Sequence, residues 1–238
     1  KGFGVEELKN GLTAAGAIIH YLRDTEHPHL QHIVSLQRID RDDFLWMDRF
    51  TIRNLELIHG NAEGTHTLLA VLDNTVSAMG ARLLKRWVIF PLKDIQKINE
   101  RLETVEFLIR ETELRNKLVS HIRQCGDIER LVSKIPMKKI NPREVLQLAR
   151  GLKQVEILKQ SNLDTSNEYL KRLGDALNPC PYIAGKIFKE ITENPPALAA
   201  KGGMISNGVN PELDELRHIS SSGKEYLAQL QQQEADRT

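Results

Sequence analysis

The sequence has few of the residues that build disulfide, metal or membrane structures. Its two cysteines, Cys125 and Cys180, lie far apart and form no CxxC pair, which argues against a disulfide framework or a Cys-rich zinc site. No apolar run approaches the length of a membrane span, and residues 1–4 lack the apolar core of a signal peptide. These absences predict a protein of the reducing cytoplasm.

The chain also lacks an excess of either charge. Thirty-three Lys and Arg residues stand against thirty-two Asp and Glu, and the formal net charge is +1. Nothing global therefore attracts phosphates or an anionic membrane. An apolar content of 40% within 238 residues is enough for a folded core. Because the chain opens without Met and ends mid-pattern at Glu234-Ala235-Asp236-Arg237-Thr238, we expect it to be a piece of a longer protein.

The apolar spacing predicts an all-α fold with a few short strands. Apolar residues recur three and four apart over 5–22, 95–109, 114–122 and 145–158, and two shorter helices are expected between Ser161 and Asn194. Start signals include Asp94, Gly126-Asp127 and the capping sequence Asn141-Pro142-Arg143-Glu144. The strand candidates are Ile33–Ile39, Phe44–Met47 and a short piece around Met204 and Ile205.

Residues 67–92 form the most closely specified passage. It predicts a short helix over 67–72, a break at Asp73-Asn74-Thr75, and a second helix, capped by Thr75 or Ser77, that runs to about Ile89. We expect Arg82 to lie within reach of Asp73, and Gly80 to permit close approach of another backbone. A broad apolar face that includes Trp87 predicts a buried joint, and its proposed members are Asp73, Thr75, Gly80, Arg82 and Trp87.

Three other patterns were considered as sites. The histidines His20, His27, His29 and His32 lie close in sequence but lack the paired spacing of a structural zinc site. Gly185-Lys186 lacks the earlier Gly and the following Ser or Thr of a phosphate-binding loop. The basic cluster Lys134, Lys138, Lys139 and Arg143 could contact phosphate, but a solvated face offset by nearby acids is favoured. The sequence predicts no catalytic residues and no cofactor or metal ligands for this chain.

The passage over 67–92 closely resembles the core domain of the MutS family of DNA mismatch repair proteins. The family pattern is Leu-Asp-x-Thr, then Gly-x-Arg, then a hydrophobic helix with Trp and a Pro-Leu stop. The matching residues here are Leu72, Asp73, Thr75, Gly80, Arg82, Leu84, Trp87, Pro91 and Leu92. Further matches are Pro28-His29-Leu30, Asn54-Leu55-Glu56, Asp127-Ile128-Glu129-Arg130, Pro142-Arg143, Gly202-Gly203-Met204-Ile205 and Asn210-Pro211-Glu212-Leu213-Asp214.

The resemblance implies a domain organisation. It assigns 1–25 to the end of a connector and a linking helix, 26–209 to the helical core, and 210–238 to an ascending lever helix that stops before a DNA-holding clamp. The resemblance places the mismatch-reading domain outside this chain, and the chain has no Walker sequence, so neither mismatch insertion nor ATP hydrolysis is expected of it. In the full-length protein the resemblance implies ATP and magnesium, mismatched duplex DNA, a homodimer and a MutL-type partner. This piece alone should bind DNA weakly.

The last helix is expected to begin at Asn210 and Pro211 and to run to the end, over roughly 40 Å. An apolar stripe runs along this helix, and such a stripe is stable only against a partner. The resemblance implies that this partner is a returning lever helix. Two rival interpretations remain open, a helical protein-interaction scaffold without DNA or ATP function and a helical enzyme with its site at the histidines. The proposed lever stripe consists of Leu213, Leu216, Ile219, Tyr226, Leu227 and Leu230.

Overall fold

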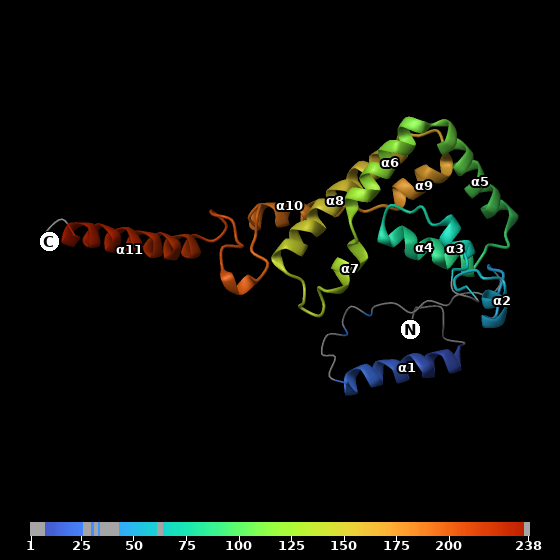
Figure 1. The fold of residues 1–238 in the computed structure, drawn as a ribbon, viewed down its shortest axis with the longest axis horizontal. Coiled ribbons are helices and arrows are strands. Elements are labelled where there is room, and N and C mark those ends of the chain that lie inside the picture. The colour runs from blue at the N-terminus through green and yellow to red at the C-terminus, as the bar shows by residue number, and fades with distance from the viewer. Residues whose placement is uncertain (1–7, 26–29, 31–32, 34–42, 61–63, 236–238) are drawn as a thin grey trace.

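The structure is a computed structural model that describes residues 8–25, 30, 33, 43–60 and 64–235. This described part is all-α, as predicted, and contains eleven α-helices (Figure 1). The helices are α1 (Lys9–Asp24), α2 (Arg49–Asn54), α3 (Leu68–Leu72), α4 (Ala78–Ile89), α5 (Ile95–Arg110), α6 (Thr112–Cys125), α7 (Ile128–Ser133), α8 (Pro142–Leu163), α9 (Glu168–Ala176), α10 (Pro181–Glu190) and α11 (Pro211–Ala235). A short 3-10 helix spans Ala199–Lys201.

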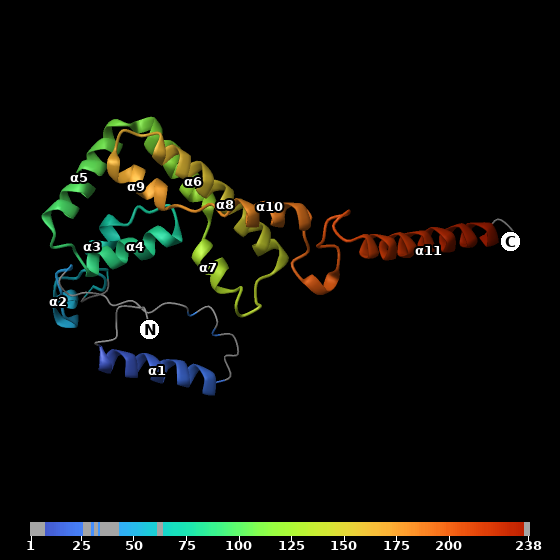
Figure 2. The same ribbon diagram turned by 180° about the vertical axis from the view of Figure 1, so that it is seen from behind.

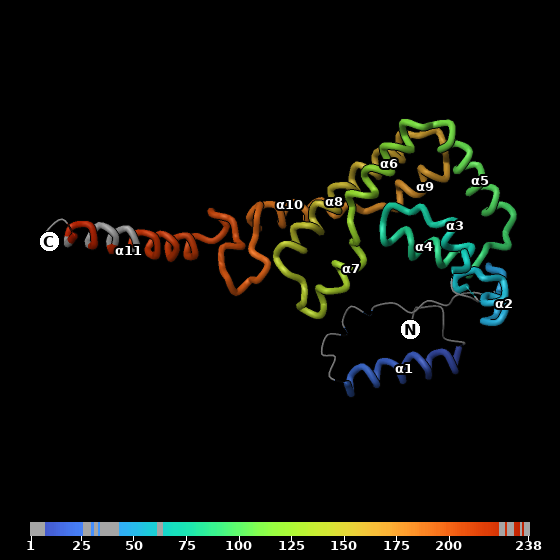
Figure 3. Tube along the Cα trace, viewed as in Figure 1, coloured from blue at the N-terminus to red at the C-terminus, as the bar shows by residue number. Residues whose placement is uncertain are grey.

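Helix α8 is the central element, because α6, α7, α9 and α10 all pack against it. Seen from both sides, α6 and α8 run together along the body, α5 turns away from α6 at a corner, and α9 lies inside that corner (Figures 1 and 2). Helices α3 and α4 lie below this corner. Helix α11 leaves the opposite end of the body as a single rod, which the trace in Figure 3 also shows.

Local capping signals set where most of these helices begin. Asn141 and Glu144 form a reciprocal capping box at the start of α8, and Pro142 occupies its first turn. Asp94 accepts hydrogen bonds from the amides of Gln96 and Lys97 at the start of α5. Each cap satisfies amides that have no partner within the helix. The sequence predictions of these helix starts are confirmed.

The core lies where α6 and α8 run antiparallel. Leu118 and Cys125 of α6 and Leu158 of α8 are buried together. A Cβ atom on Gly151 of α8 would lie only 2.5 Å from the carbonyl oxygen of Cys125, so glycine permits this close approach. His121 on α6 and Gln154 on α8 add a hydrogen bond of 2.7 Å between Nδ1 and Oε1. The position of α6 on α8 therefore depends on the absence of a side chain at Gly151.

The strand candidates correspond to small local pairings where the structure describes them. The pairings expected at 44–47 and 204–205 are isolated bridges, Phe44 with Leu92 and Ile191 with Ile205, and no longer strand is formed in the described ranges. The Ile33–Ile39 candidate falls almost entirely outside the described residues. Helix α2 was not predicted, although the Asp48 side chain caps it by accepting from the amide of Thr51 at 2.7 Å.

We expect Gly151→Ala to lower the free energy of unfolding by about 1–3 kcal/mol, the usual cost of overpacking. The added methyl would meet backbone, which cannot rotate away as a side chain can. Denaturant unfolding monitored by circular dichroism would measure the change. Gly185→Ala is the matched control, because Gly185 is exposed in α10 and a Cβ there meets no atom within 4 Å. Equal stability of the two variants would contradict the close approach.

Candidate functional site

The turn between α3 and α4 is built from the pattern Asp-x-Thr and a serine cap. The Asp73 carboxylate accepts hydrogen bonds from the hydroxyl of Thr75 at 2.6 Å and from its amide at 3.1 Å. These hydrogen bonds hold the pKa of Asp73 below its usual value of 3.8. Ser77 then caps α4 by accepting from the amide of Gly80 at 3.1 Å. Asp73 and Thr75 therefore fix the conformation of the turn that separates α3 from α4.

Arg82 on α4 contacts the start of α7. Its Nη1 and Nη2 atoms donate to the two carboxylate oxygens of Asp127 at 2.9 and 2.7 Å, which is a bidentate pair. Its Nε and Nη2 atoms also donate to Glu129 Oε2 at 3.0 and 2.5 Å. Asp73, which we expected to lie within reach of Arg82, instead closes the turn with Thr75, and Arg82 pairs with Asp127 and Glu129.

Asp127 makes two structural contacts, one within its own helix and one with α4. It caps α7 by accepting from the amide of Arg130 at 3.2 Å, and it binds Arg82 of α4. The hydrogen bonds from Arg82 and Arg130 lower the pKa of Asp127 from 3.8 to about 2, against the opposing effect of desolvation. The same contacts raise the pKa of Arg82 above its ordinary value. This ion pair links α4 to the helices that pack on α8.

Trp87 makes a second link, from α4 to α5. The guanidinium carbon of Arg101 lies 3.7 Å from the centroid of the Trp87 ring, which is a cation–π contact. The indole is nevertheless 38% exposed, and no residue of α4 is fully buried. The prediction of a buried face on α4 is therefore wrong for this chain.

The expected role of Gly80 is also wrong. The atoms nearest to a Cβ at Gly80 would be the Ser77 hydroxyl at 3.1 Å and the Thr75 side chain, both from the adjoining turn. The close backbone approach belongs instead to Gly151. We call Arg82, Asp127, Glu129, Trp87 and Arg101 the α4 joint. Its partners on α5 and α7 were missed, although Gly126-Asp127 had been recognised as a helix stop and cap.

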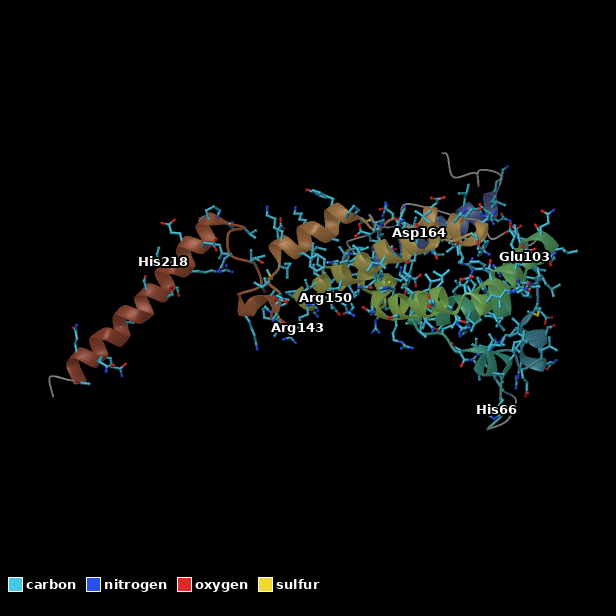
Figure 4. All side chains as sticks on the ribbon, turned by 90° about the horizontal axis from the view of Figure 1, so that it is seen from above. His66, Glu103, Arg143, Arg150, Asp164 and His218 are labelled. Carbon is cyan, nitrogen blue, oxygen red and sulfur yellow. The ribbon has the colours of Figure 1, made fainter. Side chains whose placement is uncertain are left out.

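The basic cluster is divided between structural contacts and solvent. Lys134 forms an ion pair with Glu144, and this pair lowers the pKa of the Glu144 carboxyl. Arg143 donates from Nε to the carbonyl oxygen of Pro195 at 3.0 Å. Figure 4 shows Arg143 and Arg150 along α8, towards the α11 end of the body. Only Lys138 and Lys139 of this cluster are both exposed and without a described partner.

The remaining candidates provide no site in the described part of the chain. His20 lies 2.9 Å from Asp24 across one turn of α1, whereas His27, His29 and His32 are outside the described residues. Among the residues that could be searched, no group of His, Cys, Asp and Glu could hold a metal ion. Gly185 and Lys186 lie within α10 rather than in a phosphate-binding loop.

Helix α11 carries the proposed lever stripe. Leu213 at its base is half-buried, whereas Leu216 and Ile219 are each 58% exposed and Leu227 is 67% exposed. The side chains of Tyr226 and Leu230 are outside the described part. Beyond its first two turns, α11 extends away from the body in every view (Figures 1, 2 and 4).

Comparison with known proteins places these features in one family. Residues 50–237 match the family described as MutS domain III. The chain is 50% identical over 238 residues to a DNA mismatch repair protein MutS of Bacteroides thetaiotaomicron, and it covers 28% of that protein. A MutS of Phocaeicola vulgatus is 50% identical, with 27% covered, and one of Cytophaga hutchinsonii is 46% identical, with 28% covered. The chain thus spans little more than a quarter of these relatives.

In the described part of the chain, no helix combines the length and the apolar character needed to cross a bilayer.

We expect Arg82→Ala to lower the free energy of unfolding at neutral pH, and this effect should shrink on acidification. The folded pKa of Asp127 is about 2, below its ordinary value of 3.8. A depressed folded pKa contributes stability above the ordinary value and loses it as the pH falls through the folded one. Denaturant unfolding at several values between neutral pH and about pH 3 would measure the difference.

A double-mutant cycle separates the ion pair from the cap. Asp127→Asn keeps a side-chain oxygen that can cap α7 while it removes the charge that faces Arg82. Lys85→Ala, at an exposed position of the same helix, controls for loss of a charge. An Arg82→Ala effect of the same size in the wild-type and Asp127→Asn backgrounds would show that the pair contributes nothing.

Proposed function

Because this chain belongs to the MutS domain III family, we propose that it mechanically couples a DNA-holding clamp to an ATPase in the longer protein. The match of residues 50–237 to MutS domain III shows this membership. The chain itself is proposed to carry no catalytic step. Its proposed task is to transmit movement between the parts that bind DNA and the parts that bind ATP.

The observation that carries this proposal is α11. It is a continuous helix of 25 residues, which corresponds to about 37 Å at 1.5 Å per residue. It leaves the body at one end, and most of its described apolar stripe is exposed. A continuous helix is stiff along its axis, so a rotation at its base moves its far end by a large distance. These are the properties required of a lever.

The charge distribution supports a coupling role over a DNA-binding role for this chain. Its formal net charge of +1 gives little neutralisation of phosphates. Two of the four residues in the basic cluster are already bound to protein groups. We propose that the longer protein binds mismatched DNA, ATP and magnesium through other domains, that it forms a homodimer in the cytoplasm, and that it engages a MutL-type partner.

The α4 joint supports the same proposal. Arg82 connects helices that are more than forty residues apart in the sequence, and Trp87 adds a contact to α5. Both contacts are partly exposed to solvent, so water can replace them when helices shift. Discrete polar contacts of this kind allow two alternative arrangements of rigid helices.

A flexible segment created in α11 by two substitutions tests the function. In the longer protein, Ser221→Gly with Ser222→Gly would create three consecutive glycines with Gly223. Each glycine in a helix interior costs about 1 kcal/mol relative to alanine. The factor by which ATP changes DNA affinity, commonly about 5- to 150-fold for coupled sites, should fall towards one. DNA binding without ATP and ATP hydrolysis without DNA should be retained.

The control replaces the same two serines with alanine, which keeps the helix stiff. Mismatched-duplex titrations with and without ATP would be run on both variants. Full coupling in the triple-glycine protein would contradict the lever function. Absence of any ATP effect in the unmodified longer protein would favour the alternative, a helical scaffold that only binds proteins.

The exposed lever stripe leads to a separate prediction about the behaviour of α11 in this chain alone. Because Leu216, Ile219 and Leu227 are exposed, we expect α11 beyond Gly223 either to fray or to pair with a second copy. Amide exchange would report fraying, and light scattering would report pairing. The Leu216→Gln and Leu227→Gln variants should weaken pairing without changing the body. A strict monomer with strong amide protection after Gly223 would contradict dependence on a missing partner.

A further inference from the structure

The base of α11 is tied to the segment that precedes it. On α11, Arg217 donates from Nη2 to the carbonyl oxygen of Ile205 at 2.9 Å and from Nη1 to Oδ1 of Asn207 at 3.0 Å. One turn earlier, the Asp214 carboxylate accepts from the amide of Gly208 at 2.7 Å. Asp214 and Arg217 also contact each other at 3.4 Å. We call these two side chains, with the Ile205 carbonyl group, the Asn207 side chain and the Gly208 amide, the α11 latch.

The latch is connected to the body through a bridged loop, residues 191–206. Ile191 pairs with Ile205, the amide of Thr192 donates to Met204 at 2.9 Å, and the amide of Ser206 donates to Glu190 at 2.8 Å. This loop follows α10, which packs against α8. Arg143 of α8 holds the middle of the loop through the carbonyl oxygen of Pro195. An unbroken series of contacts therefore runs from α8 to α11.

Stability of α11 alone does not require Arg217. The helix is already capped by Asn210, whose side chain accepts from the amide of Leu213 at 3.1 Å. A carboxylate such as Asp214 in the first turn is favoured by the helix dipole, but a cation in the N-terminal half gains nothing from it. Asp214 and Arg217 are about 4.5 Å apart along the helix axis. Two contacts at different heights fix a direction, whereas one contact would leave a pivot.

We propose that Arg217 is the positioning residue that sets the direction of α11 relative to the α8 body, and that release of the latch disconnects the lever. The latch suits this role because both side chains are 30% exposed, so water can enter and solvate the separated groups. The proposal rests on the lever function for its consequence in the longer protein. The direction of α11 can be measured in this chain alone.

The first experiment measures the distribution of distances between two spin labels. The labels are attached through non-natural side chains at Ser222 on α11 and at Lys153 on the exposed face of α8, so both cysteines stay unchanged. Arg217→Ala should make the distribution about twofold broader, because α11 then pivots about its remaining contacts. Arg217→Lys should give an intermediate width, since one ammonium cannot reach the carbonyl and the amide oxygen in the same fork geometry.

Ser220→Ala, at an exposed position of α11, is the matched control and should leave the width unchanged. Circular dichroism shows whether each variant keeps its helix content. If Arg217→Ala loses helix, Arg217→Met replaces it, because methionine has good helix propensity and an unbranched stem but donates no hydrogen bond to Ile205 or Asn207. An unchanged width in a helical variant without the latch overturns the proposal.

The second experiment separates failure of the latch from failure of the lever. In the longer protein, Arg217→Ala should reduce the ATP effect on DNA affinity as strongly as the triple-glycine variant does. Loss of coupling with triple glycine but not with Arg217→Ala overturns the latch and leaves the lever intact. Coupling that survives both changes overturns the lever function itself, whatever the spin-label distances show.

Discussion

The close approach of α6 to α8 at Gly151 is the constraint on which the remaining arrangement depends. The space for a side chain at this position is filled by the Cys125 carbonyl, and Ile128 of α7 lies beside it. Because α7 follows directly, the same contact fixes where Asp127 can meet Arg82. Helices α9 and α10 also pack on α8, so the bridged loop and α11 take their positions from it. The α4 joint and the α11 latch are thus placed by one helix.

Helix α5 exposes much of its apolar surface. On α5, Ile95, Leu102, Val105 and Ile109 are spaced along one helix face and are all more than half exposed. Large exposed apolar faces generally mark contact surfaces. This supports the proposal that the domain is a link between other parts of a longer protein.

Sequence reasoning succeeded where structure is decided by neighbours in the chain. The caps at Ser77, Asp94, Asp127 and Asn141 were predicted because a cap satisfies amides only two or three residues away. It failed for contacts between distant segments. Arg82 had acidic residues available near and far, and nothing local selects Asp127, 45 residues away, over Asp73.

Glycine presents the same problem. Gly80 and Gly151 both interrupt apolar helical patterns, and only the packing of α6 decides which of them has a backbone against it. The direction of α11 was likewise beyond prediction. The motif over 210–214 identifies a helix start, but the hydrogen bonds of Arg217 run backwards to a loop whose course depends on α8 and α10.

The chemistry of the two joints supports the proposal of a stiff body with movable joints. The α6–α8 contact is apolar and tightly packed, so shifting it would expose buried side chains and open a void. The α4 joint and the α11 latch instead use guanidinium groups that stay partly hydrated. Separating such groups costs less free energy than opening the apolar core, because water replaces the lost hydrogen bonds. The bidentate contact of Arg82 and the forked contact of Arg217 still favour one arrangement of the helices. Motion is therefore expected at the joints, while the body that connects them keeps its shape.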